Sequence, residues 1–162
     1  MKTIAVIGWK NSGKTTLVSR LVSHLRKKKF KVGVVKHAHH TFDIDHPNTD
    51  SYKIRQAGSY KTTIVSEKRL AHIEEKISSE IDIEELIKFN NGCDILIFEG
   101  FKKIKKLSKI EVNLTKNNKE LLYKSFDNVK LLVSDDMSGH SIKVLRHDQV
   151  NEITKEILSD SF

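Results

Sequence analysis

The alternation of apolar and polar segments along the chain predicts strands and helices in turn. Four short, continuous apolar runs are typical of strands buried on both faces of a parallel sheet. They cover residues 3–7, 32–36, 95–98 and 131–133. After the first run, apolar residues recur at helical spacing from Lys14 onward, and this pattern fades into cations that suit a helix C-terminus. The first two strands and this helix therefore predict a β-α-β unit with a right-handed crossover.

Shorter patterns predict the remaining elements. Alternation of apolar residues with Glu111 and Asn113 is the mark of a half-exposed strand near residues 110–114. A short helix should begin at Thr49 or Asp50 and end at Gly58. The other expected elements are a β-hairpin over residues 61–65 and 69–73, a helix over 82–90, a further candidate strand over 142–145 and a terminal helix over 150–158.

This order of elements predicts a single α/β domain over residues 1–162. We expect a mostly parallel sheet of the P-loop NTPase type, with helices on both faces and a β-hairpin extension. A chain of 162 residues with 38% apolar content can bury one sizeable core. No stretch approaches the roughly 20 apolar residues of a membrane span, and the N-terminus lacks the features of a signal peptide, so we expect a cytoplasmic protein.

The charge of the chain narrows the choice of partners, and its cysteine content excludes an internal disulfide. The chain has 29 Lys and Arg against 21 Asp and Glu, a net charge of +8 that favours anionic partners such as nucleotides. It has neither an arginine-rich groove-reading pattern nor an RNP-type aromatic motif, so nucleic acid is a minor alternative. Cys93 is the single cysteine and cannot form an internal disulfide.

Residues 8–15 carry the clearest chemical signal. They read Gly-Trp-Lys-Asn-Ser-Gly-Lys-Thr, matching G-x-x-x-x-G-K-[ST] between a buried strand and an amphipathic helix. The glycines let backbone N–H groups turn inward, and the helix start adds its positive dipole end, so the main chain can hold a polyphosphate. The expected binding residues are Gly8, Asn11, Ser12, Gly13, Lys14, Thr15 and Thr16.

Three side chains of this segment have individual expected roles. Lys14 should reach the β- and γ-phosphates and is the expected catalytic residue, Thr15 should bind Mg²⁺, and Thr16 should lie near the α-phosphate. A second metal-side carboxylate is expected at Glu99, which ends the strand at residues 95–98. The alternative for Glu99 is an ordinary acid at a strand end.

The loop at residues 37–50 concentrates metal-binding side chains. It holds four of the eight histidines, including His39, His40 and His46, together with Asp43 and Asp45. A zinc site would use the imidazoles, but no cysteine accompanies them and the spacing matches no common structural zinc pattern. A hard-cation site would use the two carboxylates, and we prefer it because the phosphate loop already calls for Mg²⁺. A solvated polar loop is the third reading.

The chain resembles a known family, the MobB adapter proteins of molybdopterin-guanine dinucleotide biosynthesis. The resemblance rests on the phosphate loop and on three further segments in the same order. These segments are Val35-Lys36-His37 leading through Asp43-Ile44-Asp45-His46-Pro47 to Asp50-Ser51-Tyr52, then Arg55-Gln56-Ala57-Gly58, and Ile97-Phe98-Glu99-Gly100-Phe101-Lys102. Beyond residue 102 the likeness is weak.

The resemblance implies a GTP-binding protein with Mg²⁺, weak in hydrolysis by itself and homodimeric. It implies that the protein assists a MobA-type guanylyltransferase, which joins a GMP moiety to molybdopterin. Carried over to this chain, the metal-side acids are Asp45 and Glu99. The guanine would be read by Asp135 or Asp136 after a late strand, although no complete Asn-Lys-x-Asp motif is present.

Two other functions fit the same residues. A P-loop small-molecule kinase would need an acceptor pocket and an arginine-bearing lid, and no arginine of the sequence sits in an obvious lid. A non-enzymatic module that binds a pterin or a metal would use the histidine loop and the basic surface, and this is compatible with the adapter role.

Overall fold

The computed structural model describes residues 1–38, 42–75 and 82–162. The chain divides into two compact units, of which the first combines Met1–His37 with Ile83–Phe162 and the second is Ala38–Asp82. The second unit is therefore an insertion between two elements of the first. That both units belong to one domain stays a prediction.

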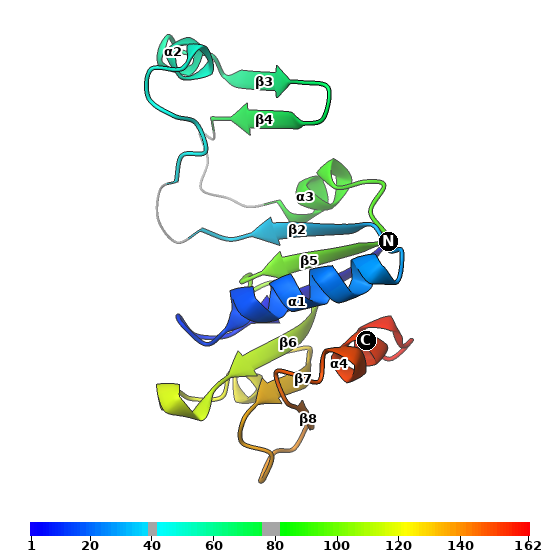
Figure 1. The fold of residues 1–162 in the computed structure, drawn as a ribbon. Helices are drawn as coiled ribbons and strands as arrows, with labels where there is room; N and C mark the ends of the chain where they lie inside the picture. The colour runs from blue at the N-terminus through cyan, green and yellow to red at the C-terminus, as the bar shows by residue number, and fades with distance from the viewer. Residues whose placement is uncertain (39–41, 76–81) are drawn as a thin grey trace. The chain divides into compact units, whose positions relative to one another are not determined.

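The first unit is built on a six-stranded sheet in the order β2-β5-β1-β6-β7-β8 (Figure 1). Every pair of neighbouring strands in this sheet is parallel. The strands are β1 (Lys2–Ile7), β2 (Val32–Lys36), β5 (Ile95–Glu99), β6 (Ser108–Asn113), β7 (Val129–Ser134) and β8 (Lys143–Leu145). The predicted α/β class with a mostly parallel sheet is confirmed, and β5 lies between the two strands of the first β-α-β unit.

Two helices cover one face of this sheet, α1 (Lys14–Lys27) and α4 (Val150–Leu158) (Figure 1). Leu17, Leu21 and Leu25 of α1 are fully buried, as their spacing predicts. They pack with alternate residues of the strands, such as Ile4 and Val6 of β1. This packing fixes the start of α1 beside the end of β1, where the glycine-rich segment lies.

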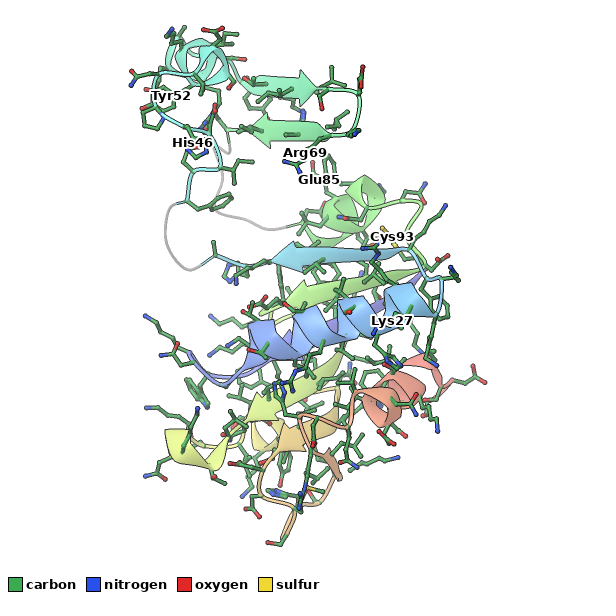
Figure 2. All side chains as sticks on the ribbon, viewed as in Figure 1. Lys27, His46, Tyr52, Arg69, Glu85 and Cys93 are labelled. Carbon is green, nitrogen blue, oxygen red and sulfur yellow. The ribbon has the colours of Figure 1, made fainter. Side chains whose placement is uncertain are left out.

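Before β5 the chain forms α3 (Ile83–Phe89). Between β6 and β7 it forms the 3₁₀ turns η1 (Thr115–Asn117) and η2 (Leu122–Lys124). Cys93, before β5, is half-buried (Figure 2). Its sulfur lies 3.0 Å from the position that a Cβ on Gly33 of β2 would take, so it fills space between elements.

The prediction that β6 is half-exposed is wrong, because its polar residues are buried as well. Glu111 is 0% and Lys109 is 1% exposed. The Glu111 carboxylate accepts hydrogen bonds from the N–H groups of Leu122 and Tyr123, and Lys109 donates to the Asp127 carbonyl. The polar positions of β6 therefore face the backbone of the irregular segment rather than water.

The second unit contains α2 (Asp50–Gln56) and an antiparallel hairpin of β3 (Lys61–Val65) and β4 (Leu70–Glu74). The predicted short helix and hairpin are thus confirmed. Thr49 caps α2 by accepting a hydrogen bond from the N–H of Tyr52. The side chain of Tyr52 is labelled in Figure 2. Among the described residues, no helix is both long and apolar enough to cross a bilayer.

Candidate functional site

The loop between β1 and α1 needs glycine at two positions. Gly8 has φ +153°, and a Cβ there would lie 2.4 Å from the carbonyl oxygen of Val112 and 2.5 Å from Oγ of Ser12. Gly13 has φ +91°, in the left-handed region that side chains rarely adopt. The two glycines of the motif therefore allow the tight path that brings the chain from the strand to the helix.

The start of α1 is prepared for an anion. Gly13 is the N-cap and has no side chain with which to satisfy the first N–H groups of the helix, and the first turn carries no acidic residue. These N–H groups and the positive end of the helix dipole point toward the loop. A phosphate group would supply the missing acceptors.

Lys14 extends over the loop from the first residue of α1. Its ammonium group donates a hydrogen bond to the Trp9 carbonyl at 2.7 Å. Burial lowers the pKa of Lys14, Glu99 opposes this effect, and the nearby charges of Lys36 and Lys102 add to the lowering. A cation partly withdrawn from water and surrounded by like charges gains from the arrival of an anion.

Thr15 and Glu99 meet beside the loop. The Thr15 hydroxyl donates to Oε1 of Glu99 at 2.5 Å, and the Glu99 side chain is only 8% exposed. Lys36, the last residue of β2, lies 3.2 Å from the same carboxylate oxygen and 3.4 Å from the Thr15 hydroxyl. A hydroxyl and a carboxylate at this spacing are the hard oxygen donors that Mg²⁺ prefers, so these two residues fit the expected metal.

The turn that follows Glu99 is unusual. Gly100 and Phe101 both have positive φ, +100° and +58°, and for a bulky residue such as Phe101 this conformation is strained. The Phe101 ring is held against Phe98 and His37, with ring centroids 5.2 and 5.3 Å away. This packing keeps the end of β5, and with it Glu99, in a defined position.

The loop and the start of α1 border a cleft of about 580 Å³. It is lined by residues 11–16 together with Arg20, Leu114, Lys116 and His147. An adjoining cleft of about 350 Å³ shares Arg20, Leu114 and His147, and adds Ser134, Asp135, Arg146 and Asp148. Because the two clefts share three residues, an elongated ligand can extend from the phosphate loop toward Asp135.

Asp135, the expected reader of guanine, lies in the second cleft at the end of β7. Its carboxylate accepts hydrogen bonds from both the N–H and the hydroxyl of Thr115, each at 2.8 Å. The N–H of Thr115 is the main cause of the lowered pKa of Asp135. The neighbouring Asp136 accepts instead from the N–H and hydroxyl of Ser138. Of the two candidates, only Asp135 lines the cleft.

Asp45, the other expected metal ligand, belongs to the second unit. Its carboxylate accepts hydrogen bonds from the hydroxyls of Thr49 and Ser51, at 3.0 and 2.9 Å, and lies 3.5 Å from the Arg55 guanidinium. Asp43 accepts from Arg55 at 2.8 Å. In this arrangement both carboxylates help to hold the second unit together, and metal binding by Asp45 stays a prediction.

Part of the histidine loop can be assessed. His39 and His40 lie outside the described residues. Within the described parts of the chain, no group of three or more His, Cys, Asp or Glu side chains is arranged to hold a metal. The zinc hypothesis therefore gains no support from His37 and His46.

Comparison with known proteins identifies the family. A family model described as "Molybdopterin guanine dinucleotide synthesis protein B", MobB, matches residues 3–135. The chain belongs to the MobB family. A crystal structure of molybdopterin-guanine biosynthesis protein B (mobB) has the same fold, with a TM-score of 0.76 and 28% identity, and the match covers 96% of this chain and 97% of that one.

Other MobB proteins agree with this assignment. Bacillus subtilis MobB has a TM-score of 0.76 at 21% identity over 99% of both chains, which supports the fold alone. The molybdopterin-guanine dinucleotide biosynthesis adapter protein of Escherichia coli (strain K12) is 35% identical over 102 residues, 61% of this chain and 58% of its own length. A putative adapter protein of this kind from Methanocaldococcus jannaschii is 30% identical over 138 residues, 83% of this chain and 56% of its own length. The chain thus spans little more than half of these curated MobB relatives.

Sequence reasoning missed three residues that surround the phosphate loop. Arg20 lies two turns into α1, and its guanidinium contacts His147, whose ring reaches the carbonyl oxygen of Gly13. No local pattern marks these two residues, because the contacts between them span more than 120 positions of sequence. Lys36 ends a predicted strand, but its closeness to Glu99 follows from the pairing of β2 with β5, which the sequence did not predict.

Proposed function

We propose that this chain binds GTP with Mg²⁺ and acts as a cytoplasmic adapter in molybdenum guanine dinucleotide cofactor synthesis, where it assists the enzyme that joins GMP to molybdopterin. The observation that carries the proposal is the glycine loop that opens on a cleft of about 580 Å³, bordered by Lys14 and the uncapped start of α1. The names of the Escherichia coli and Methanocaldococcus jannaschii relatives, both adapter proteins of this biosynthesis, support the pathway.

The residues of the loop divide the work of binding. Backbone N–H groups from residues 11–16 hold the phosphate oxygens, and Lys14 neutralises charge on the β- and γ-phosphates. Thr15 and Glu99 are the ligands that would hold the metal, which when bound screens the phosphate charge. Phosphoryl transfer asks the protein mainly for positioning and electrostatics, so these groups alone account for slow hydrolysis.

In the proposed function, the preference for guanine over adenine depends on Asp135. A carboxylate with a lowered pKa is a good acceptor for the two N–H groups on the guanine edge. In the structure, this carboxylate accepts two hydrogen bonds from Thr115. Guanine would therefore take over acceptors that Thr115 occupies, and an adenine base offers no matching pair of donors.

Assembly with a second copy is the remaining part of the proposal. In the hairpin of the second unit, Val65 and Leu70 are register partners and are 74% and 65% exposed. Neighbouring apolar side chains with this exposure are typical of surfaces that become covered on association. Light scattering of the purified protein would test the homodimer, and a mass equal to one chain at micromolar concentration would contradict it.

Calorimetric titration tests nucleotide binding directly. GTP, ATP and GDP are titrated in magnesium buffer into the wild type, Lys14→Ala and Lys27→Ala. Lys27→Ala removes an equal charge at the opposite end of α1, so this variant should bind GTP as the wild type does. Lys14→Ala should bind GTP at least about tenfold more weakly. Absence of heat with every nucleotide would overturn the proposal, and a preference for ATP would remove its guanine part.

Two activity assays separate the adapter from the alternatives. Phosphate release should be slow and independent of small-molecule acceptors, because a kinase would show turnover that depends on an acceptor. Added to a guanylyltransferase with molybdopterin and GTP, the wild type should increase formation of the dinucleotide cofactor, and Lys14→Ala should not. Equal stimulation by both proteins would mean that nucleotide binding is not part of the adapter role.

A further inference from the structure

Lys36 stands where the expected metal would bind. It is the register partner of Glu99 in the parallel pair of β2 and β5, so both side chains leave the same end of the sheet on the same face. Its ammonium nitrogen lies 3.2 Å from Oε1 of Glu99 and 3.4 Å from the Thr15 hydroxyl oxygen. One cation thus contacts both oxygens that fit Mg²⁺.

The ammonium group and a metal ion cannot use these oxygens together. Mg²⁺ binds oxygen at about 2.1 Å in a near-octahedral shell, so an ion bound to Oε1 of Glu99 and to the Thr15 hydroxyl would compete with Lys36 for both atoms. A divalent ion at that place would also lie within a few ångströms of a positive charge, where repulsion is strong. Metal binding therefore requires Lys36 to leave.

Lys36 is free to make this movement. Its side chain is 58% exposed, whereas that of Glu99 is 8% exposed. The exposed ammonium can swing at little cost, while the buried carboxylate stays in place and would lose this ion-pair contact if Lys36 left without a replacement.

We propose that Lys36 is the resident cation of the Thr15–Glu99 pair and excludes divalent metal until a nucleotide polyphosphate arrives. The inference rests on the proposed binding of a magnesium nucleotide. The phosphates bring a metal to the pair and at the same time offer Lys36 a new anionic partner, the terminal phosphate. Metal binding is thereby made conditional on the nucleotide, and a triphosphate is favoured over a diphosphate.

Manganese binding to the nucleotide-free protein tests the exclusion. Mn²⁺ replaces Mg²⁺ at oxygen sites, and electron paramagnetic resonance counts the free ion. Titrations up to millimolar Mn²⁺ at fixed ionic strength compare the wild type with Lys36→Met, which keeps the length of the side chain without its charge. Lys36→Met should bind Mn²⁺ at least about tenfold more tightly than the wild type. Equal binding, including none to either protein, overturns the proposal.

Three further variants locate the effect. Lys36→Arg keeps the charge and should exclude the metal as the wild type does. Lys27→Met removes one charge at the far end of α1, where Lys27 is labelled in Figure 2. The helical rise places Lys27 about 20 Å along the helix from Lys14. Lys27→Met should leave Mn²⁺ binding unchanged. Adding Glu99→Gln to Lys36→Met should abolish the gained binding. A gain in Lys36→Arg or Lys27→Met equal to that in Lys36→Met, or a gain that survives Glu99→Gln, contradicts the proposal.

Nucleotide titrations of the same proteins separate this inference from the proposed function. Lys36→Met should lose preference for GTP over GDP by about fivefold or more, because one cation for the terminal phosphate is missing. An unchanged preference contradicts the transfer of Lys36 to that phosphate. If the wild type binds no nucleotide, the proposed function fails while the Mn²⁺ result still decides the exclusion.

Discussion

His147 donates a hydrogen bond from its Nε2 atom to the carbonyl oxygen of Gly13, at 3.1 Å. The direction follows from the other side of the ring, where Nδ1 lies 2.9 Å from a guanidinium nitrogen of Arg20. A guanidinium can only donate, so Nδ1 accepts and Nε2 carries the hydrogen. The loop after β8 is thereby tied to the N-cap of α1, between the two clefts.

Replacing His147 by alanine should loosen the phosphate loop. One hydrogen bond to a loop carbonyl contributes about 1 kcal/mol, so His147→Ala should lower the free energy of unfolding by about that amount. It should also weaken GTP binding about fivefold, since the ligand must then order the loop. Urea denaturation and calorimetric titration measure the two effects. Unchanged affinity would mean that the His147 contact is incidental to the site.

Gly8 and Gly139 offer a matched pair of glycine substitutions. A Cβ on Gly8 would overlap the Val112 carbonyl and Ser12, whereas a Cβ on Gly139, at φ +72°, would meet nothing within 4 Å. Gly8→Ala should therefore cost about 2–4 kcal/mol from overlap and backbone strain. Gly139→Ala should cost about 1 kcal/mol from strain alone. Chemical denaturation compares them, and equal costs would show that the close contacts at Gly8 relax easily.

Nucleotide titration completes the comparison of the two glycine variants. Gly8→Ala should lose GTP binding beyond detection, because the loop cannot keep its path with a side chain at that position. Gly139→Ala should bind GTP as the wild type does. Normal binding by Gly8→Ala would show that the loop path seen between β1 and α1 is not required for the phosphate.

Local patterns were enough to predict the elements that carry the loop. The apolar run at residues 32–36 coincides with β2, and helical spacing from Lys14 gave the start of α1, because both signals are contained within a few turns of chain. The glycine motif is equally local. Its position between a buried strand and an amphipathic helix is what sequence can specify without knowledge of distant contacts.

Contacts between distant segments could not be predicted in this way. Glu111 looked solvent-facing because it alternates with apolar residues, but its partners are the N–H groups of η2, in a segment without any periodic pattern. His147 meets Gly13 only because β8 ends beside the start of α1. Lys36 could be placed near Glu99 only once the order β2-β5-β1 was known.

Arg55 should be essential for the second unit. Its side chain is 10% exposed and contacts three carboxylates, those of Asp43, Asp45 and Glu75. Hydrogen bonds to Asp43 and Glu75 raise the pKa of Arg55. Arg55→Met would leave the carboxylates to repel one another, so hydrogen exchange in α2 and the hairpin should become faster, while β1 and α1 stay protected. Lys53→Met, which removes an exposed cation of the same helix, should change neither.

The measurement on Arg55→Met is mass-resolved hydrogen exchange of peptides from both units at one pH. Equal protection of α2 in the wild type and Arg55→Met would mean that the charge cluster is not what orders the second unit. Faster exchange throughout the chain would mean that the two compact units do not unfold independently of each other.

Glu111 should give the stability of the first unit a distinctive pH dependence. Burial of its carboxyl group raises its pKa above 4.5, against the opposing effect of the two N–H groups from η2 and the charge of His140. A raised pKa means that the folded protein binds this proton more tightly than the unfolded chain does. Its contribution to stability is therefore complete below pH 4.5 and is lost as the pH rises through the folded pKa.

Comparison with Glu111→Gln isolates this contribution, since glutamine does not titrate. Carboxyl groups with lowered pKa values, such as Asp43 and Asp135, contribute less to the stability of the fold as the pH falls. They are present in both proteins, so their contributions cancel in the difference. The free energy of unfolding of the wild type minus that of Glu111→Gln should therefore decrease as the pH rises from 4.5. Urea denaturation at half-unit steps of pH measures it. A difference that increases with pH would show that the two hydrogen bonds from η2 outweigh burial, because they favour the charged carboxylate.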